Sequence, residues 1–193
     1  MSRLRTSLLL AAVGLMVVSI VGISATSAGS KPAFAIRKVD KQVVLYTIYR
    51  GSYDKVGPAI GKLYALAGSK GVRPIGAMSH VYLNNPKLVT SQHWLTEIRI
   101  PVGKEALKLS GTLGEMTDVK ALPAMEVLVA VKPKGQADPA PIYEELYRRV
   151  LKEGYLATEG SIETFLTNAE TGNYAQMKTE IMIPVSRLPE DKN

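Results

Sequence analysis

Apolar residues follow two periods along the chain, and together these periods predict an α+β fold. Segment 42–50 is dense in valine, leucine, tyrosine and isoleucine, which favours a strand. Apolar residues then recur at helical spacing between Val56 and Ala67, and Gly71 stands where that helix should end. Two short strands are predicted next, at 79–83 and 94–102.

The same pattern returns 83 residues further along the chain. Segment 95–102 reads LTEIRIPV and segment 178–185 reads KTEIMIPV, while Gly154 takes the place of Gly71. The second copy predicts a helix with apolar residues from Tyr143 to Leu151 and strands at 162–166 and 176–185. Short leading strands are predicted at 35–39 and 119–122. Because this period exceeds that of solenoid repeats, it indicates a duplicated module.

The two copies define the expected domain organisation. Repeat 1 covers 36–102, a connector with three glycines covers 103–118, and repeat 2 covers 119–185. A polar tail follows at 186–193. Each half is small for independent folding, so we expect one domain of tandem strand-helix-strand-strand modules with pseudo-twofold symmetry.

The first 35 residues differ from this domain. Residues 6–28 carry no charge, Arg3 and Arg5 precede them, and small residues follow. This pattern fits a cleaved signal peptide, an uncleaved membrane anchor or, less simply, a buried core helix. Segment 29–35 is interpreted as a linker. A cleaved signal peptide and an uncleaved anchor both predict an exported, periplasmic or extracytoplasmic domain, which residues 6–28 would attach to the inner membrane if no cleavage occurs.

Composition excludes several kinds of site. The chain of 193 residues has no cysteine and two histidines, which excludes disulfides and thiolate zinc sites and argues against a histidine-rich metal site. We expect neither a metal nor a cofactor. The formal net charge is +7, but no polybasic run is present, so no nucleic-acid partner is expected. The sequence does not fix the oligomeric state.

Several motifs resemble the GyrI-like family of small-molecule-binding domains, which also form the effector-binding part of AraC- and MerR-type regulators. They are Tyr46-Thr-Ile-Tyr-Arg-Gly-Ser-Tyr53, Val81-Tyr-Leu-Asn-Asn-Pro86 and the two Thr-Glu-Ile-x-Ile-Pro-Val segments at 96–102 and 179–185. The resemblance covers 36–185 and implies a ligand groove formed by two pseudo-symmetric modules. Fewer than 40 residues precede it, so a DNA-binding regulator is not expected.

The resemblance also implies a site residue. Many members carry an inward glutamate on the penultimate strand of the second module, and Glu163 occupies that position here. A carboxylate in an apolar groove suits either binding of a cation or acid–base chemistry. The alternative is that Glu163 faces solvent on an edge strand.

Other candidates flank Glu163 in the predicted sheet. His80 is its partner at the 83-residue offset, so it would point into the same groove, although an exposed histidine at the strand edge is the alternative. Aromatic side chains could stack on a planar or cationic ligand. Glu97 and Glu180, in the repeated Thr-Glu-Ile, are interpreted as structural. The candidate ligand-binding residues are Glu163, Tyr46, Tyr82, His80, Trp94 and Phe165.

Two functions remain open at this point, with a small-molecule ligand as the expected partner in both. The first is an exported or membrane-tethered domain that binds an aromatic or cationic small molecule. The second, implied by some free-standing relatives, is a hydrolase of strained electrophiles in which Glu163 acts with Tyr46 or Tyr82. A haem-binding relative, with His80 as the iron ligand, is a third and weaker reading.

Overall fold

Strands and helices follow the predicted order in the computed structural model, which describes residues 33–166 and 177–189. These residues belong to one compact unit, Pro32–Asn193. The elements are β1 (Phe34–Val39), β2 (Gln42–Arg50), η1 (Tyr53–Lys55), α1 (Gly57–Ser69), β3 (Ser79–Tyr82), η2 (Ser91–His93), β4 (Leu95–Val102), η3 (Lys104–Leu109), β5 (Thr117–Leu122), β6 (Met125–Lys132), α2 (Ala140–Lys152), β7 (Tyr155–Ala157), β8 (Ile162–Phe165) and β9 (Thr179–Arg187).

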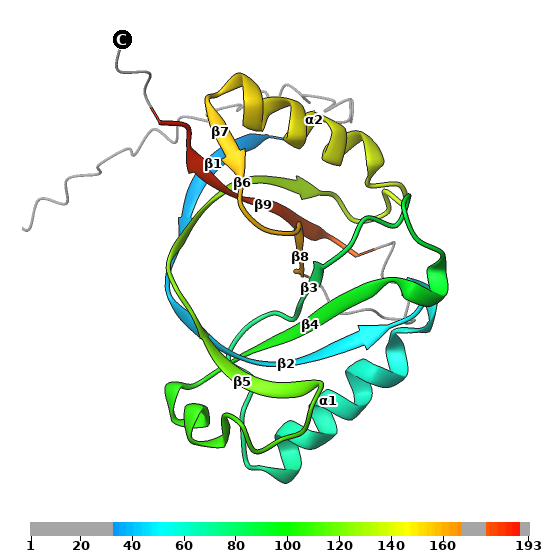
Figure 1. The fold of residues 1–193 in the computed structure, drawn as a ribbon, viewed down its shortest axis with the longest axis vertical. Helices are drawn as coiled ribbons and strands as arrows, with labels where there is room; N and C mark the ends of the chain where they lie inside the picture. Colours follow the sequence, from blue (N-terminus) through cyan, green and yellow to red (C-terminus); the bar gives the residue numbers. More distant parts are fainter. Residues whose placement is uncertain (1–32, 167–176, 190–193) are drawn as a thin grey trace, which may run out of the picture. The chain divides into compact units, whose positions relative to one another are not determined.

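The described strands form one antiparallel sheet of nine strands. Its order is β1-β6-β9-β8-β3-β4-β2-β5, and β7 pairs with β9 beyond the end of β8. In Figure 1 the long strands β6 and β9 lie in the upper half and β2 and β4 in the lower half, with the short strands β3 and β8 between them. The fold is therefore α+β, as predicted.

Each leading strand pairs with the opposite half of the chain. β1 lies against β6, and β5 lies against β2. Corresponding elements are 83 residues apart: α1 begins at Gly57 and α2 at Ala140, and β3 begins at Ser79 and β8 at Ile162. The origin of this spacing in a duplication stays a prediction. The β3–β8 pair joins the two halves in one sheet, and the exchanged leading strands β1 and β5 lie at its two ends.

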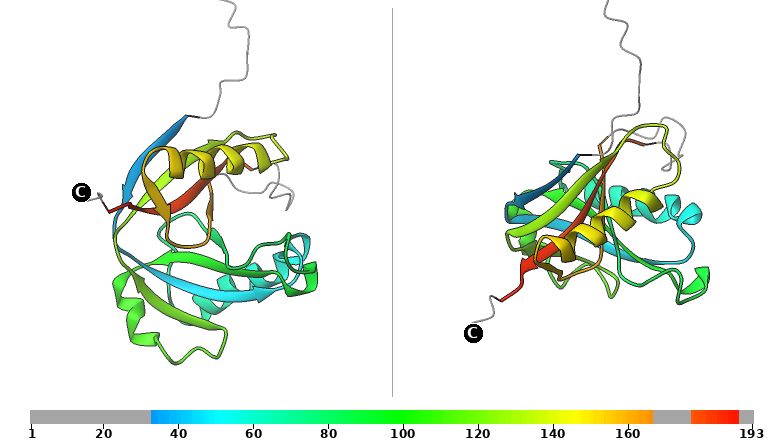
Figure 2. Two further views of the ribbon diagram at one scale, coloured as in Figure 1. Left: turned by 45° about the horizontal axis from the view of Figure 1, so that its top comes forward. Right: turned by 90° about the horizontal axis from the view of Figure 1, so that it is seen from above.

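Strand register assigns alternate residues to two faces of the sheet. On the first, Leu45, Ile98 and Ile100 pack with the buried side of α1, and a second core cluster joins Leu128 and Ile183 to α2. Both helices therefore cover the same face, here called the helix face. Figure 2 shows them at separate places along the sheet, α1 in cyan and α2 in yellow.

Two glycines end the helices as the sequence predicts. Gly71 has φ +66° and Gly154 has φ +76°, a left-handed conformation that glycine adopts without steric cost. Tyr64 and Tyr147 lie within the predicted apolar spacing of the two helices but are 40% and 45% exposed. Their spacing is helical, but the buried stripe of each helix lies on neighbouring positions such as Leu63 and Leu146.

Three predictions at the ends of elements need comment. The polar tail was expected to begin at residue 186, but β9 continues to Arg187, because β7 pairs with it there. The segment Glu170-Thr-Gly-Asn173, whose composition predicts a turn, lies outside the described residues. So does the predicted leader or anchor at 6–28. Within the residues that are described, no helix is long and apolar enough to span a membrane.

Candidate ligand-binding cleft

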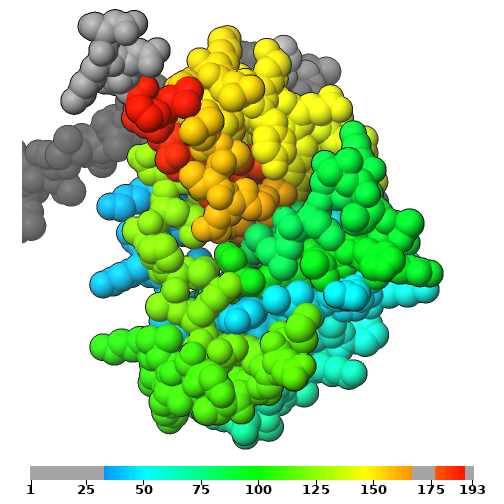
Figure 3. Space-filling view, in the orientation of Figure 1, coloured from blue at the N-terminus to red at the C-terminus, as the bar shows by residue number. Residues whose placement is uncertain are grey.

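A cleft of about 900 Å³ opens on the helix face, where β3 and β8 meet at the middle of the sheet. The space-filling view shows the surfaces of the two halves meeting, with yellow and orange residues of α2, β7 and β8 above green and cyan residues (Figure 3). The residues that line the cleft come from both halves: Tyr53, Val56, His80, Tyr82, Leu83, Asn84, Asn85, Pro86, Lys87, Lys132, Ala137, Asp138, Pro139, Ala140, Tyr143, Glu144, Tyr147, Gly160, Ser161, Glu163 and Phe165.

Glu163 lies in the floor of this cleft. Its side chain is on the helix face of β8 and the residue is only 9% exposed. The hydroxyl of Tyr143 donates a hydrogen bond to Oε1 at 2.7 Å, and that of Tyr82 donates one to Oε2 at 2.9 Å. Among residues 33–166 and 177–189, no ion pair neutralises the carboxylate. Glu163 is thus oriented by two neutral hydroxyl donors, with no ion pair from a described residue.

The two tyrosines are fixed as donors by their surroundings. Burial, followed by the nearby Glu163 carboxylate, raises the pKa of the Tyr82 hydroxyl well above its usual value. The same two causes raise the pKa of Tyr143 well above its usual value. Neither phenol ionises near neutral pH, so both hydroxyls keep the proton that they donate to Glu163.

His80 lies directly across from Glu163 in the β3–β8 pair. It is 4% exposed, and burial lowers its pKa to about 4. The ring packs edge-on against Phe165, with ring centres 4.7 Å apart. The imidazole is therefore neutral at pH 7 and does not supply a positive charge to Glu163. The alternative of an exposed histidine at a strand edge does not hold.

Lys132 is the buried cation at the edge of the cleft. It is 2% exposed, and its Nζ donates hydrogen bonds to the carbonyl oxygens of Gln136 and Met177, each at 2.9 Å. Burial lowers its pKa, while the charge of Glu163 acts in the opposite direction. The ammonium of Lys132 thus offsets part of the potential of Glu163 in the cleft.

Aromatic rings form one wall of the cleft. Tyr53 stacks on Trp94 with ring centres 4.4 Å apart and meets Tyr82 edge-on at 5.0 Å. Trp94 does not itself line the cleft; its Nε1 donates to the carbonyl of Val89 at 3.2 Å. Trp94 therefore supports Tyr53 from behind, and Tyr53 presents the aromatic surface.

Tyr46 does not belong to this group, although the sequence analysis placed it there. In β2 it faces away from the helices, opposite Arg99, and the Lys120 ammonium lies 4.2 Å from its ring centre. The reason is strand alternation, because Leu45 and Thr47 occupy the helix face. Of the predicted residues, the structure brings together Glu163, Tyr82, His80 and Phe165 in the cleft. Trp94 does not line the cleft but stacks on Tyr53, which does.

Sequence reasoning missed three residues of the site, Tyr143, Lys132 and Tyr53. The 83-residue offset held a signal for two of them. Tyr143 takes the place of buried Ile60, and Lys132 takes the place of Tyr49. Polar groups that replace a core residue in only one of two similar halves mark where the halves differ in chemistry. Tyr53 carried no comparable signal.

Comparison with known proteins identifies one segment of the chain. Residues 106–186 match the family model of the GyrI-like small molecule binding domain. The matched segment contains β6, α2, β8 and β9, and so includes both Glu163 and Tyr143. A search of curated proteins finds no match.

Solved structures resemble the fold beyond that segment. The C-terminal domain of EcmrR is 18% identical with a TM-score of 0.64, over 81% of this chain and 99% of that domain. EcmrR in a complex with DNA is 17% identical with a TM-score of 0.65, over 81% of this chain. This chain spans only 58% of that protein. A hydrolase from Listeria innocua is 17% identical with a TM-score of 0.59, over 79% of this chain and 91% of the hydrolase. Identities this low show the fold alone.

The cleft presents a defined set of chemical groups. A carboxylate held by two phenols lies beneath aromatic rings, and the lining has three carboxylates against two lysines. Such a surface can hold a small organic molecule by stacking and by charge. Within the described residues, no group of three or more acidic or histidine side chains is arranged to hold a metal ion.

Proposed function

We propose that the domain binds a small organic cation with an aromatic or apolar body, with Glu163 as the anchor. The observation that carries this proposal is the buried carboxylate of Glu163, oriented by Tyr82 and Tyr143 and not paired with a cation among the described residues. A buried charge without a close counterion is costly, and a cationic ligand lowers that cost.

The shape and lining of the cleft support the same class of ligand. Its volume of about 900 Å³ suits a drug-sized molecule. Tyr53 and Tyr82 present ring faces and edges within reach of the floor, and a cation above an aromatic face gains about 0.5–2 kcal/mol. A neutral aromatic molecule would keep the stacking but not the contact with Glu163.

A thermal-shift screen tests the proposal. The purified protein and its Glu163→Gln variant are heated with matched cationic, neutral and anionic aromatic compounds. Ligands that bind the native state raise the melting temperature by mass action. We expect cations to give the largest increase in the wild type and to lose most of it in Glu163→Gln. An increase that is equal for cations and neutral compounds in both proteins contradicts the proposal.

A second candidate function is hydrolysis of a strained electrophile. Its support is the contact of Glu163 with two phenols, since a carboxylate can activate water while a tyrosine hydroxyl donates a proton to the leaving group. Tyr82 or Tyr143 would take the role that the sequence analysis gave to Tyr46 or Tyr82. Turnover of an epoxide panel that disappears in Glu163→Gln and in Tyr143→Phe would favour this function over binding alone.

We further propose that the domain is exported and remains attached to a membrane unless residues 6–28 are removed. The uncharged segment behind Arg3 and Arg5 supports this proposal. Cell fractionation with mass spectrometry of the purified chain tests it. A cytoplasmic protein of full mass would contradict export, and a mass lacking the first residues would show cleavage.

A further inference from the structure

A second cavity lies on the face of the sheet opposite the helices. This hollow has a volume of about 1060 Å³ and is lined by strands from both halves and by the segments that follow β1 and β4. Ser79 and Thr164 line it, whereas their chain neighbours His80 and Glu163 line the cleft. The hollow is therefore separated from the cleft by the thickness of the sheet.

Positive charge dominates the lining of the hollow. Four basic side chains, Arg37, Lys41, Arg99 and Lys104, face one carboxylate, Glu180. Arg37 and Glu180 form a two-point ion pair, with N–O distances of 2.9 and 2.6 Å, and so neutralise each other. Neither Lys41 nor Lys104 forms an ion pair with any residue that the structure describes.

Arg99 supplies a buried positive charge at the hollow. The residue is 5% exposed, and its Nε donates to Oε1 of Glu97 at 2.5 Å. The same carboxylate also accepts from Lys120, with Nζ 2.7 Å from Oε1. One carboxylate is thus shared by two cations, so the group of Arg99, Glu97 and Lys120 keeps a net positive charge.

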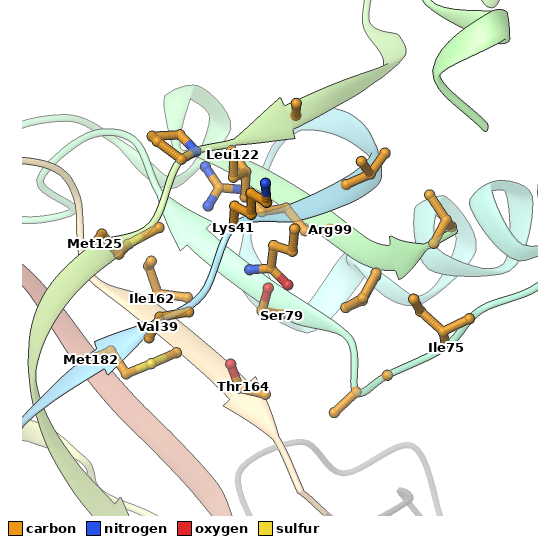
Figure 4. Close-up of a pocket in the computed structure, with 18 of the residues that line it drawn as sticks. Val39, Lys41, Ile75, Ser79, Arg99, Leu122, Met125, Ile162, Thr164 and Met182 are labelled. Atoms are coloured by element: carbon orange, nitrogen blue, oxygen red, sulfur yellow. The ribbon is translucent and has the colours of Figure 1, made fainter. Parts of the chain in front are cut away.

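Hydroxyl groups extend from Arg99 across the sheet. Arg99 lies opposite Ser79, Ser79 opposite Thr164, and Thr164 opposite Glu180, so these four residues form one polar row. Direct cross-strand neighbours have their Cβ atoms about 5 Å apart. In Figure 4 the hydroxyls of Ser79 and Thr164 point toward the same hollow as Arg99. The row offers hydrogen-bond donors beside the guanidinium.

Apart from Gln42 and two glycines, the rest of the described lining is aliphatic and contains no aromatic ring. Figure 4 shows Val39, Met125, Ile162 and Met182 on one side of the hollow and Lys41 and Arg99 on another. An elongated apolar body fits the first group, and an anionic head group fits the second. The hollow therefore differs from the aromatic cleft both in net charge and in the kind of apolar side chain that lines it.

We propose that this hollow binds an aliphatic carboxylate, with its head group near Arg99, Lys41 and Lys104 and its chain along Val39, Met125, Ile162 and Met182. The ion pair of Arg37 with Glu180 closes the far end of the polar row without adding net charge. The site is independent of Glu163 and of the function proposed for the cleft.

Decanoate is the probe that tests this site, and the methionine methyl groups are the reporters. Met125 and Met182 line the hollow, whereas Met78 and Met177 are buried in the core beneath α1. The full-length chain is isotopically labelled on its methionine methyls, and each signal is assigned by a Met→Leu variant. We expect decanoate to shift the signals of Met125 and Met182 along one saturable curve and to leave those of Met78 and Met177 in place.

Charge variants decide whether the basic groups hold the ligand. The exposed pair Lys41→Gln with Lys104→Gln should weaken decanoate binding about tenfold, because two uncompensated charges are removed. Arg99→Gln should weaken it as well, if that variant folds. Lys62→Gln, an exposed lysine on α1, is the matched control and should leave the affinity unchanged.

Four results would overturn the proposal. The first is the absence of a saturable shift at Met125 and Met182. The second is a shift confined to Met78 and Met177, which would place the ligand on the helix face. The third is equal binding of decyltrimethylammonium, and the fourth is an unchanged decanoate affinity in the double lysine variant.

Discussion

The cleft on the helix face and the hollow on the opposite face are cavities of similar volume with opposite character. The cleft has aromatic walls and three carboxylates against two lysines, while the hollow has aliphatic walls and four basic side chains against one carboxylate. Both are built on the same central strands. The alternation of side chains along β3 and β8 separates them, since His80 and Glu163 point one way and Ser79 and Thr164 the other.

The difference arises from positions where the two halves of the chain disagree. His80 and Glu163 are equivalent by the 83-residue offset and meet at the centre of the sheet. On the other face, the equivalent of Arg99 is Met182. Similar halves supply the scaffold, and unlike residues at equivalent positions supply the charge of each cavity.

Lowering the pH tests how burial of His80 on the helix face affects the free energy of unfolding, and its expected effect is the largest of those considered. His80 has a pKa of about 4 in the native protein and about 6.5 when unfolded, so the unfolded chain binds the extra proton between these values. Stability is therefore complete above pH 6.5 and falls as the pH drops toward 4, by about 3 kcal/mol at most. Urea unfolding of the wild type and of His80→Phe at pH 7 and pH 4.5 measures it.

His80→Phe keeps the groups that face His80, namely Glu163 across the strand pair, Tyr82 and Phe165. The difference between the two proteins therefore isolates the contribution of the His80 ring. A stability difference between wild type and variant that does not change with pH would show that His80 is not responsible.

Removing Arg99 tests the opposite face with the next largest effect. Arg99 and Glu97 are both buried, so Arg99→Met leaves a buried carboxylate with only Lys120 beside it. We expect a loss of about 2–3 kcal/mol in the free energy of unfolding. Arg37→Met, which removes the half-exposed partner of Glu180, should cost less than about 1 kcal/mol. Denaturant unfolding measures both, and equal losses would contradict the difference in burial.

Replacing Lys132 sharpens the contrast in charge and has the smallest expected effect. Its ammonium opposes the potential of Glu163 in the cleft, so Lys132→Met should strengthen binding of an organic cation about three- to tenfold. Lys87→Met removes an exposed lysine from the rim and should change the affinity less. Calorimetric titration measures both affinities. Weaker cation binding in Lys132→Met would show that its contacts with Gln136 and Met177 matter more than its charge.

Much of the fold could be predicted because its signals are local. Apolar periods located β2 and α1, and Gly71 and Gly154 marked the helix ends. The offset predicted that His80 and Glu163 share one groove, and the β3–β8 pair places them directly opposite each other. The pairing of β1 with β6 could not be predicted from the sequence. It depends on which half of the sheet each leading strand joins, and the local residue pattern does not show this.

The site residues were harder to predict where they depend on the face of a strand to which a side chain points, or on contacts between segments far apart in the chain. Both faces of β2 carry apolar and aromatic residues, so no alternation indicated that Tyr46 points away from Glu163. Tyr143 reaches Glu163 through the rotation of α2 on the sheet, which spacing does not show. Lys41 and Lys104 line the same hollow as Arg99 because the segments after β1 and β4 fold over it. Glu97, interpreted as structural, is the buried partner of that arginine.

Calorimetric titration of two ligands into two variants tests most directly the claim that the faces select opposite charges. The ligands are naphthylmethyl trimethylammonium and decanoate, and the variants are Glu163→Gln and the pair Lys41→Gln with Lys104→Gln. We expect Glu163→Gln to weaken the cation at least about tenfold and to leave decanoate unchanged, and the lysine pair to do the reverse. Loss of both ligands in either variant, or of neither, would contradict the account.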